Sequence, residues 1–200
     1  MSILQTLRDA RPRRFRLQLT RARSCCHICE FALPSHTVRA FPSGLYSDPL
    51  RDLLRVVIAL NPEPARHDWL EVSDWTSFSW DCEPDMFNWK FRHLKKVAGI
   101  RLIITHGIHV NAPGANVIVD TILEERELFH QIWENACTLL REGGMAYEAS
   151  HAPFPVREFW KVHEIVTGEK APNSLADEIH LMTRIAGMHR NEQRRDPEEA

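Results

Sequence analysis

The stretch that decides the fold is residues 69–106, WLEVSDWTSFSWDCEPDMFNWKFRHLKKVAGIRLIITH, which holds four of the six tryptophans. Three segments of it alternate between apolar and polar side chains, as half-buried strands do. Glu83-Pro84-Asp85 separates the first two segments, because proline fixes φ and cannot donate to a strand ladder. The pattern predicts a three-stranded antiparallel meander. Its apolar face consists of Phe78, Trp80 and Cys82, then Phe87, Trp89 and Phe91, then Ile100, Leu102 and Ile104.

A helix is predicted before this meander, over residues 49–60. Ser47 or Asp48 can cap it, and Pro49 fits its first position, where a missing N–H costs nothing. Asn61-Pro62-Glu63-Pro64 ends it. One apolar stripe at helical spacing marks its buried side: Leu50, Leu53, Leu54, Val57 and Ile58.

Further elements are predicted after the meander. Val117–Ile122 reads as a fourth strand, and Thr121 and Glu124 stand at capping-box spacing for a long helix over 123–142. A C-terminal helix pair follows, the first after Pro153-Phe154-Pro155 and the second from Asn173 or Ser174 to about Met188. The predicted fold is therefore α+β: a four-stranded, mainly antiparallel sheet whose apolar face is covered by helices.

The N-terminal part of the chain differs from the rest in charge. Residues 1–44 hold eight arginines against Asp9 and Glu30, a net of +6, so residues 45–200 carry −8 of the overall −2. We expect residues 1–44 to be a poorly ordered arginine-rich arm, although the alternation from Phe15 to Leu19 would also fit one short strand. Residues 45–190 are expected to form a single domain and residues 191–200 a charged tail.

The expected location is the cytoplasm. No apolar run approaches the roughly 18 residues that a membrane helix needs, and the N-terminus lacks the pattern of a secretory signal. Five cysteines, an odd number, fit reduced thiols better than a disulfide framework.

Several motifs between residues 45 and 166 resemble a group of small uncharacterised bacterial proteins. They are Asp48-Pro49-Leu50, the hairpin from Glu83 to Phe91, and, after the long helix, Gly144, Tyr147, Pro153-Phe154-Pro155 and Glu158. Where the group has a tryptophan shortly after the tyrosine, this chain has His151. The general build is similar to that of cytosolic immunity proteins of polymorphic toxin systems. This resemblance implies protein binding and no particular catalytic residue.

Two sets of residues are candidates for chemistry. Cys26 and Cys29 have the spacing of half a zinc knuckle, to which Cys25, His27 or His36 could add ligands. His106 and His109 follow the third predicted strand, and Asp120 lies in the fourth, so the three could hold a metal ion or exchange protons. No second knuckle pair and no metalloprotease helix motif accompanies them. We therefore expect ordinary thiols and surface histidines, and no cofactor.

Acidic residues suggest a partner-binding surface. We expect one patch that combines a glutamate group at the start of the long helix with the acidic hairpin turn: Glu124, Glu125 and Glu127 with Asp81, Glu83 and Asp85. Such a patch steers a basic partner and raises its association rate.

The favoured interpretation is a non-enzymatic cytosolic binding protein, most concretely an immunity-like protein that neutralises a basic toxin. A small metal-dependent enzyme using His106, His109 and Asp120 is one alternative. A nucleic-acid-associated protein, using the N-terminal arginines and a Cys/His knuckle, is the other.

Overall fold

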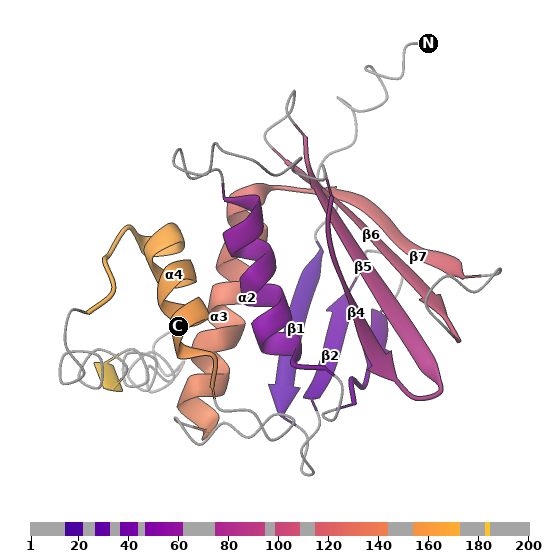
Figure 1. Cartoon of the computed structure of the whole chain (residues 1–200), viewed down its shortest axis with the longest axis horizontal. Coiled ribbons are helices and arrows are strands. Elements are labelled where there is room, and N and C mark those ends of the chain that lie inside the picture. Colours follow the sequence, from indigo (N-terminus) through magenta and orange to yellow (C-terminus); the bar gives the residue numbers. More distant parts are fainter. Residues whose placement is uncertain are drawn as a thin grey trace, which may run out of the picture.

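A computed structural model describes residues 15–21, 27–32, 37–43, 47–61, 75–94, 99–108, 115–143, 154–172 and 183–184 (Figure 1). The strands are β1 (Arg16–Arg21), β2 (His27–Ala32), β3 (Thr37–Ala40), β4 (Thr76–Cys82), β5 (Asp85–His93), β6 (Ile100–Gly107) and β7 (Asn116–Leu123). The helices are α2 (Pro49–Leu60), α3 (Glu125–Gly143) and α4 (Val156–Thr167).

The predicted α+β architecture and its four-stranded sheet are confirmed. Strands β4-β5-β6-β7 follow one another as an antiparallel meander. The β4–β5 hairpin turns at Glu83-Pro84, where the peptide bond is cis. A register shift between Ile104 and Thr105 interrupts the β6–β7 ladder, so that Thr105 pairs with Val117. In Figure 1 the helices lie on one side of this sheet and its other face is turned away from them.

The inner face of this sheet forms an aromatic core. The Trp80 and Trp89 ring centroids are 4.7 Å apart, and Phe78 stacks on Trp89 at 5.6 Å. Helix α2 packs against β4 and β5. The period-2 alternation identifies the buried side chains because every second side chain of a strand points to the same side of the sheet. The inward positions named from the sequence are buried, except Phe78 and Cys82, which are partly buried against the core.

The expectation of a poorly ordered, arginine-rich arm is wrong for the described parts of residues 15–43. They form a second antiparallel sheet in the order β1-β2-β3. Its inward side chains join the core, where the Phe31 ring lies 5.2 Å from that of Trp89. Exposed Arg16 stands between buried Phe15 and Leu17, and exposed Arg39 precedes buried Ala40, so arginines occupy the outward positions of amphipathic strands here. The inward side chains of β1 and of the residue before it are Phe15, Leu17 and Leu19.

The helices follow the predicted boundaries with one displacement. Asp48 caps α2 by accepting a hydrogen bond from the Arg51 N–H at 3.1 Å, with Pro49 in the first turn. Helix α3 begins at Glu125 rather than at 123, because Leu123 still pairs with Ile100 in the sheet. The capping box at Thr121 is therefore wrong: Thr121 lies opposite Leu102 in the β6–β7 ladder.

The C-terminal part is described only in places. Helix α4 is capped by Gly168, which has φ of 76° and donates its N–H to the Glu164 carbonyl at 2.9 Å. Glycine suits this left-handed position because it has no Cβ. The predicted last helix from 173 or 174 to 188 lies largely outside the described residues, as do residues 1–14 and 191–200. Among the described helices, none is long and apolar enough to span a membrane.

Candidate functional site

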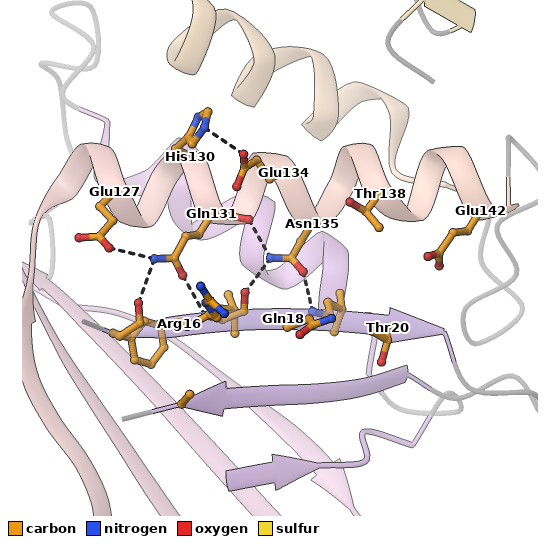
Figure 2. Close-up of a pocket in the computed structure, with 14 residues that line it drawn as sticks. Arg16, Gln18, Thr20, Glu127, His130, Gln131, Glu134, Asn135, Thr138 and Glu142 are labelled. Atoms are coloured by element: carbon orange, nitrogen blue, oxygen red, sulfur yellow. Dashed lines mark hydrogen bonds and ion pairs between the residues drawn. The ribbon is translucent and has the colours of Figure 1, made fainter. Parts of the chain in front are cut away.

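An open groove runs between strand β1 and helix α3 (Figure 2). Its volume is about 940 Å³. Arg16, Gln18 and Thr20 reach it from the outward side of β1, because they alternate with the buried Leu17 and Leu19. The side chains that α3 contributes are Glu127, His130, Gln131, Glu134, Asn135, Thr138 and Glu142.

Two amide side chains of α3 hold the edge of β1 in place beneath this groove. Gln131 accepts a hydrogen bond from the Leu17 N–H at 2.8 Å and donates to the Phe15 carbonyl at 3.0 Å. One helical turn later, Asn135 accepts from the Leu19 N–H and donates to the Leu17 carbonyl at 3.0 Å. The two amides thus supply the donors and acceptors that a neighbouring strand would supply, so the edge is closed.

Glutamates line the α3 wall of the groove. Glu127, Glu134 and Glu142 are exposed and recur after seven and eight residues, so they stand on one side of the helix. At 1.5 Å per residue they span about 22 Å along the helix axis. Arg16 is the one lysine or arginine among the lining residues. The groove is therefore an elongated acidic surface.

A smaller hollow of about 530 Å³ adjoins the groove on the α4 side. Glu124, Arg126 and Phe129 of the α3 region meet Ile165 and Val166 of α4 there. It shares two lining residues with the groove, Glu127 and His130. The His130 Nε2 lies 3.2 Å from the Glu134 carboxylate, and its ring is 5.6 Å from that of Trp133. The two hollows together make the outward side of α3 an uneven, mainly acidic surface.

The predicted acidic patch does not form one surface, and this expectation is wrong. Asp85 and His93 stand at the two ends of β5, about 26 Å apart at 3.3 Å per residue. The Glu125 carboxylate contacts the His93 Nε2 at 2.8 Å, so the glutamate group belongs to the His93 end. Asp81 and Glu83 lie with Asp85 at the hairpin turn, at the opposite end of the sheet (Figure 1). Of the six residues, Glu127 lines the groove and Glu124 the adjoining hollow.

The structure separates the two described members of the candidate metal group, His106 and Asp120. His106 lies opposite Phe87 on the inner face, with its ring 4.8 Å from the Phe87 ring and its Nε2 3.1 Å from Asp85. Asp120 lies opposite Ile103 on the outer face, where Arg101 binds both its oxygens at 2.9 and 2.7 Å. Successive side chains of a strand point to opposite faces, so His106 and Asp120 are separated by the sheet. His109 lies outside the described residues.

The cysteine cluster is only partly described. Cys29 is fully buried, and burial raises the pKa of its thiol well above the ordinary value. A buried thiol in an apolar core is a poor metal ligand and nucleophile, so the sheet removes Cys29 from a surface knuckle. Cys25, Cys26 and His36 lie outside the described residues. Within the described ranges, no three His, Cys, Asp or Glu side chains are grouped to hold a metal ion.

Sequence reasoning missed most of the groove. The glutamate spacing of 127, 134 and 142 on a predicted helix was a usable signal, because positions seven or eight apart share a helix face. Gln131 and Asn135 gave none, because their partners in β1 are 114 to 118 positions away. For β1, the alternation from Phe15 to Leu19 fits one short strand but does not indicate that the strand belongs to a sheet beside α3.

The fold and the groove define an α+β protein with an acidic, open surface beside a closed strand edge. No family model matches the chain, and no curated protein or solved structure shows significant similarity to it. Function is therefore argued from the groove itself.

Proposed function

We propose that this is a non-enzymatic protein-binding protein that holds a basic partner, most concretely an immunity-like protein that neutralises a toxin. The observation that carries the proposal is the β1–α3 groove with its three exposed glutamates (Figure 2). A groove of this shape fits an extended or helical segment of another protein better than a small substrate. Its acidic residues are spread along about 22 Å of helix rather than gathered around one reacting atom.

Charge and rigidity both support binding of a basic segment. The glutamates stand about two helical turns apart, so a helix with lysine or arginine at similar intervals can meet them in sequence. The hydrogen bonds from Gln131 and Asn135 tie the two walls of the groove together. A surface fixed before binding loses little conformational freedom on association. Acidic surfaces of this kind also accelerate encounter with basic partners.

The alternatives have weaker support. A metal-dependent enzyme needs His106 and Asp120 on one side of the sheet, and they lie on opposite faces. A Cys/His knuckle needs Cys29 at the surface, and it is buried. The remaining residues that could bind nucleic acid are the arginines of the N-terminal sequence, of which residues 1–14 lie outside the described ranges.

A charge-matched pair of variants tests the proposal. Glu134→Lys/Glu142→Lys reverses the groove, whereas Glu83→Lys/Glu164→Lys changes the net charge equally at exposed positions elsewhere. Binding of a lysine- and arginine-rich model peptide is measured by calorimetry at low and high salt. We expect the groove variant to weaken binding at least tenfold at low salt and the control to change it less than threefold, since low salt lengthens the screening distance.

A second version of the test applies where a toxic basic protein is found to be encoded beside this gene. Co-expression with the wild type or the control variant should restore growth, and the groove variant should fail. Equal protection by all three proteins would rule out the groove as the binding surface. Loss of protection on His106→Ala, with the groove variant still active, would favour the enzyme alternative instead.

A further inference from the structure

The outer face of the four-stranded sheet has no covering layer among the described elements. Its outward side chains are all exposed or half-buried, whereas their inward neighbours are mostly buried. In Figure 1 this face points away from all three labelled helices. An antiparallel sheet can present one face to water. This face, however, carries Val117 with 60% of its surface exposed. Half-buried Met86 and Ile103 lie outward on the same face.

The net charge of the outer face differs between its two ends: Lys90, Arg92 and Arg101 outnumber Asp120 at one end, and Asp81 lies at the other. Lys90 lies opposite Ser77, in the half of the sheet where Arg92 stacks over Trp75 at 5.7 Å. Asp81 lies opposite Met86 at the hairpin end. Lys90 is exposed, and no ion pair joins it or Asp81 to another described side chain. Along β5, Lys90 and Met86 stand two residues on either side of Asn88.

We propose that two copies of this chain pack together through the outer faces of their four-stranded sheets. The two-fold axis lies between the two sheets and crosses the strands at the level of Asn88 and Thr105. That axis brings Lys90 of each copy to the level of Asp81 in the other. It also places Val117, which pairs with Thr105 at the axis level, against the same residue of the second copy. A two-fold contact repeats each interaction, so both charge pairs form together.

Distances support this arrangement. Packed sheets lie about 10 Å apart and neighbouring strands about 4.8 Å apart. A lysine and an aspartate side chain can bridge that spacing. The two outward arginines stand further from the axis: Arg101 binds Asp120 within the same chain, and Arg92, directly opposite Arg101, stacks over Trp75. Lys90 and Asp81 are therefore the charged residues proposed to form the contact between copies.

The area of the face sets the expected strength. Four strands about 4.8 Å apart and about 26 Å long present roughly 500 Å² per copy. Stable dimers bury about 800 Å² per partner. We therefore expect a weak dimer with a dissociation constant of about 10–100 µM, weakened further by salt. The proposal does not depend on the β1–α3 groove, which lies on another part of the molecule.

Sedimentation velocity across a wide concentration range tests the dimer. The apparent mass should rise from 23.2 kDa towards twice that value. Lys90→Glu alone and Asp81→Lys alone should each raise the dissociation constant at least tenfold, because each places like charges together twice. An equimolar mixture of the two variants should restore dimerisation, since both contacts then join opposite charges. Asn88→Lys, at the axis, places two lysines together in the homodimer and should also raise the dissociation constant.

Circular dichroism establishes that each variant is folded. If Asp81→Lys disturbs the hairpin, Val117→Asp tests the same face independently and should abolish the dimer. A wild-type monomer at all concentrations would overturn the proposal. So would a mixture of the two charge variants that stays monomeric. Binding of a single-stranded oligonucleotide that requires Lys90, without self-association, would assign the face to nucleic acid and equally overturn it.

Discussion

The side-chain amide of Asn135 donates a hydrogen bond of 3.0 Å to the backbone carbonyl of Leu17, 118 positions earlier in the chain. The same amide accepts from the Leu19 N–H, and Gln131 repeats the arrangement one turn earlier. A helix thereby closes the edge of a sheet with side chains instead of a further strand. Without Asn135, the Leu19 N–H and the Leu17 carbonyl would be buried without partners.

Asn135→Ala should therefore lower the free energy of unfolding by about 2–4 kcal/mol, because it leaves a buried donor and a buried acceptor in β1 unsatisfied. Urea denaturation measures the change. Thr138→Ala, one turn further along and half-buried, is the control and should cost less than about 1 kcal/mol. Equal effects of the two substitutions would show that water replaces the Asn135 amide.

Trp89→Ala should destabilise the protein by about 3–5 kcal/mol, the usual cost of truncating a buried aromatic side chain. Trp89 is 1% exposed and lies against Phe31, Phe78 and Trp80. Lys90→Ala, next in sequence but exposed, should change stability by less than about 0.5 kcal/mol in dilute protein. Thermal and urea unfolding measure both. A loss below about 1 kcal/mol at Trp89 would contradict the central place of its ring in the core.

Deletion of residues 1–40 should abolish cooperative unfolding. It removes β1, β2 and β3 with their buried side chains, each of which contributes about 1.5–3 kcal/mol when fully buried. Several such losses exceed the total stability of a typical domain, about 5–15 kcal/mol. Calorimetry and near-ultraviolet circular dichroism follow the loss. A melting temperature within a few degrees of the wild type would show that the second sheet is dispensable.

Asp52→Asn should stabilise the protein above pH 6. Burial, together with the nearby Asp48 carboxylate, raises the pKa of Asp52 from 3.8 to about 6. The folded state therefore binds the proton more tightly than the unfolded state does. The resulting contribution to stability is fully present below about pH 3.8 and is lost as the pH rises through about 6.

Asparagine carries no charge, so the destabilising effect of a buried carboxylate is absent in the variant. The free energy of unfolding of the variant should therefore exceed that of the wild type by about 1–2 kcal/mol at pH 7.5, after allowance for solvent screening of the half-buried Asp52. The gain should disappear at pH 4. Urea denaturation at both pH values measures the difference. An equal gain at both would trace the effect to helix propensity or to the first turn of α2 rather than to ionisation.

An element could be predicted from the sequence when the residues that stabilise it lie close to it in the chain. The meander was predictable, because Phe87, Trp89 and Phe91 alternate within one short segment and the turn chemistry is next to it. Helix α2 was predictable for the same reason, through Asp48 and Pro49. The β1–β3 sheet was not, because a lone strand is marginal until another element satisfies its edge.

The candidate surfaces show the same division. The glutamates of α3 were visible as acidic residues, but their separation from Asp81, Glu83 and Asp85 depends on which end of β5 each group meets. Whether His106 and Asp120 point to the same side of the sheet depends on how β6 and β7 are aligned on either side of their register shift. The spacing of residues along the sequence predicts neither relationship.

The sequence by itself determined the α+β class, the meander and the two main helices, because backbone preference, side-chain periodicity and capping act over a few residues. Only the tertiary structure decided that the basic N-terminal region holds a sheet, that α3 closes its edge, and that the two acidic groups stand apart. Those outcomes depend on the hydrogen bonds of Gln131 and Asn135 and on the contact of Phe31 with Trp89. Such contacts join distant segments, and their free energy exists only once the chain has folded.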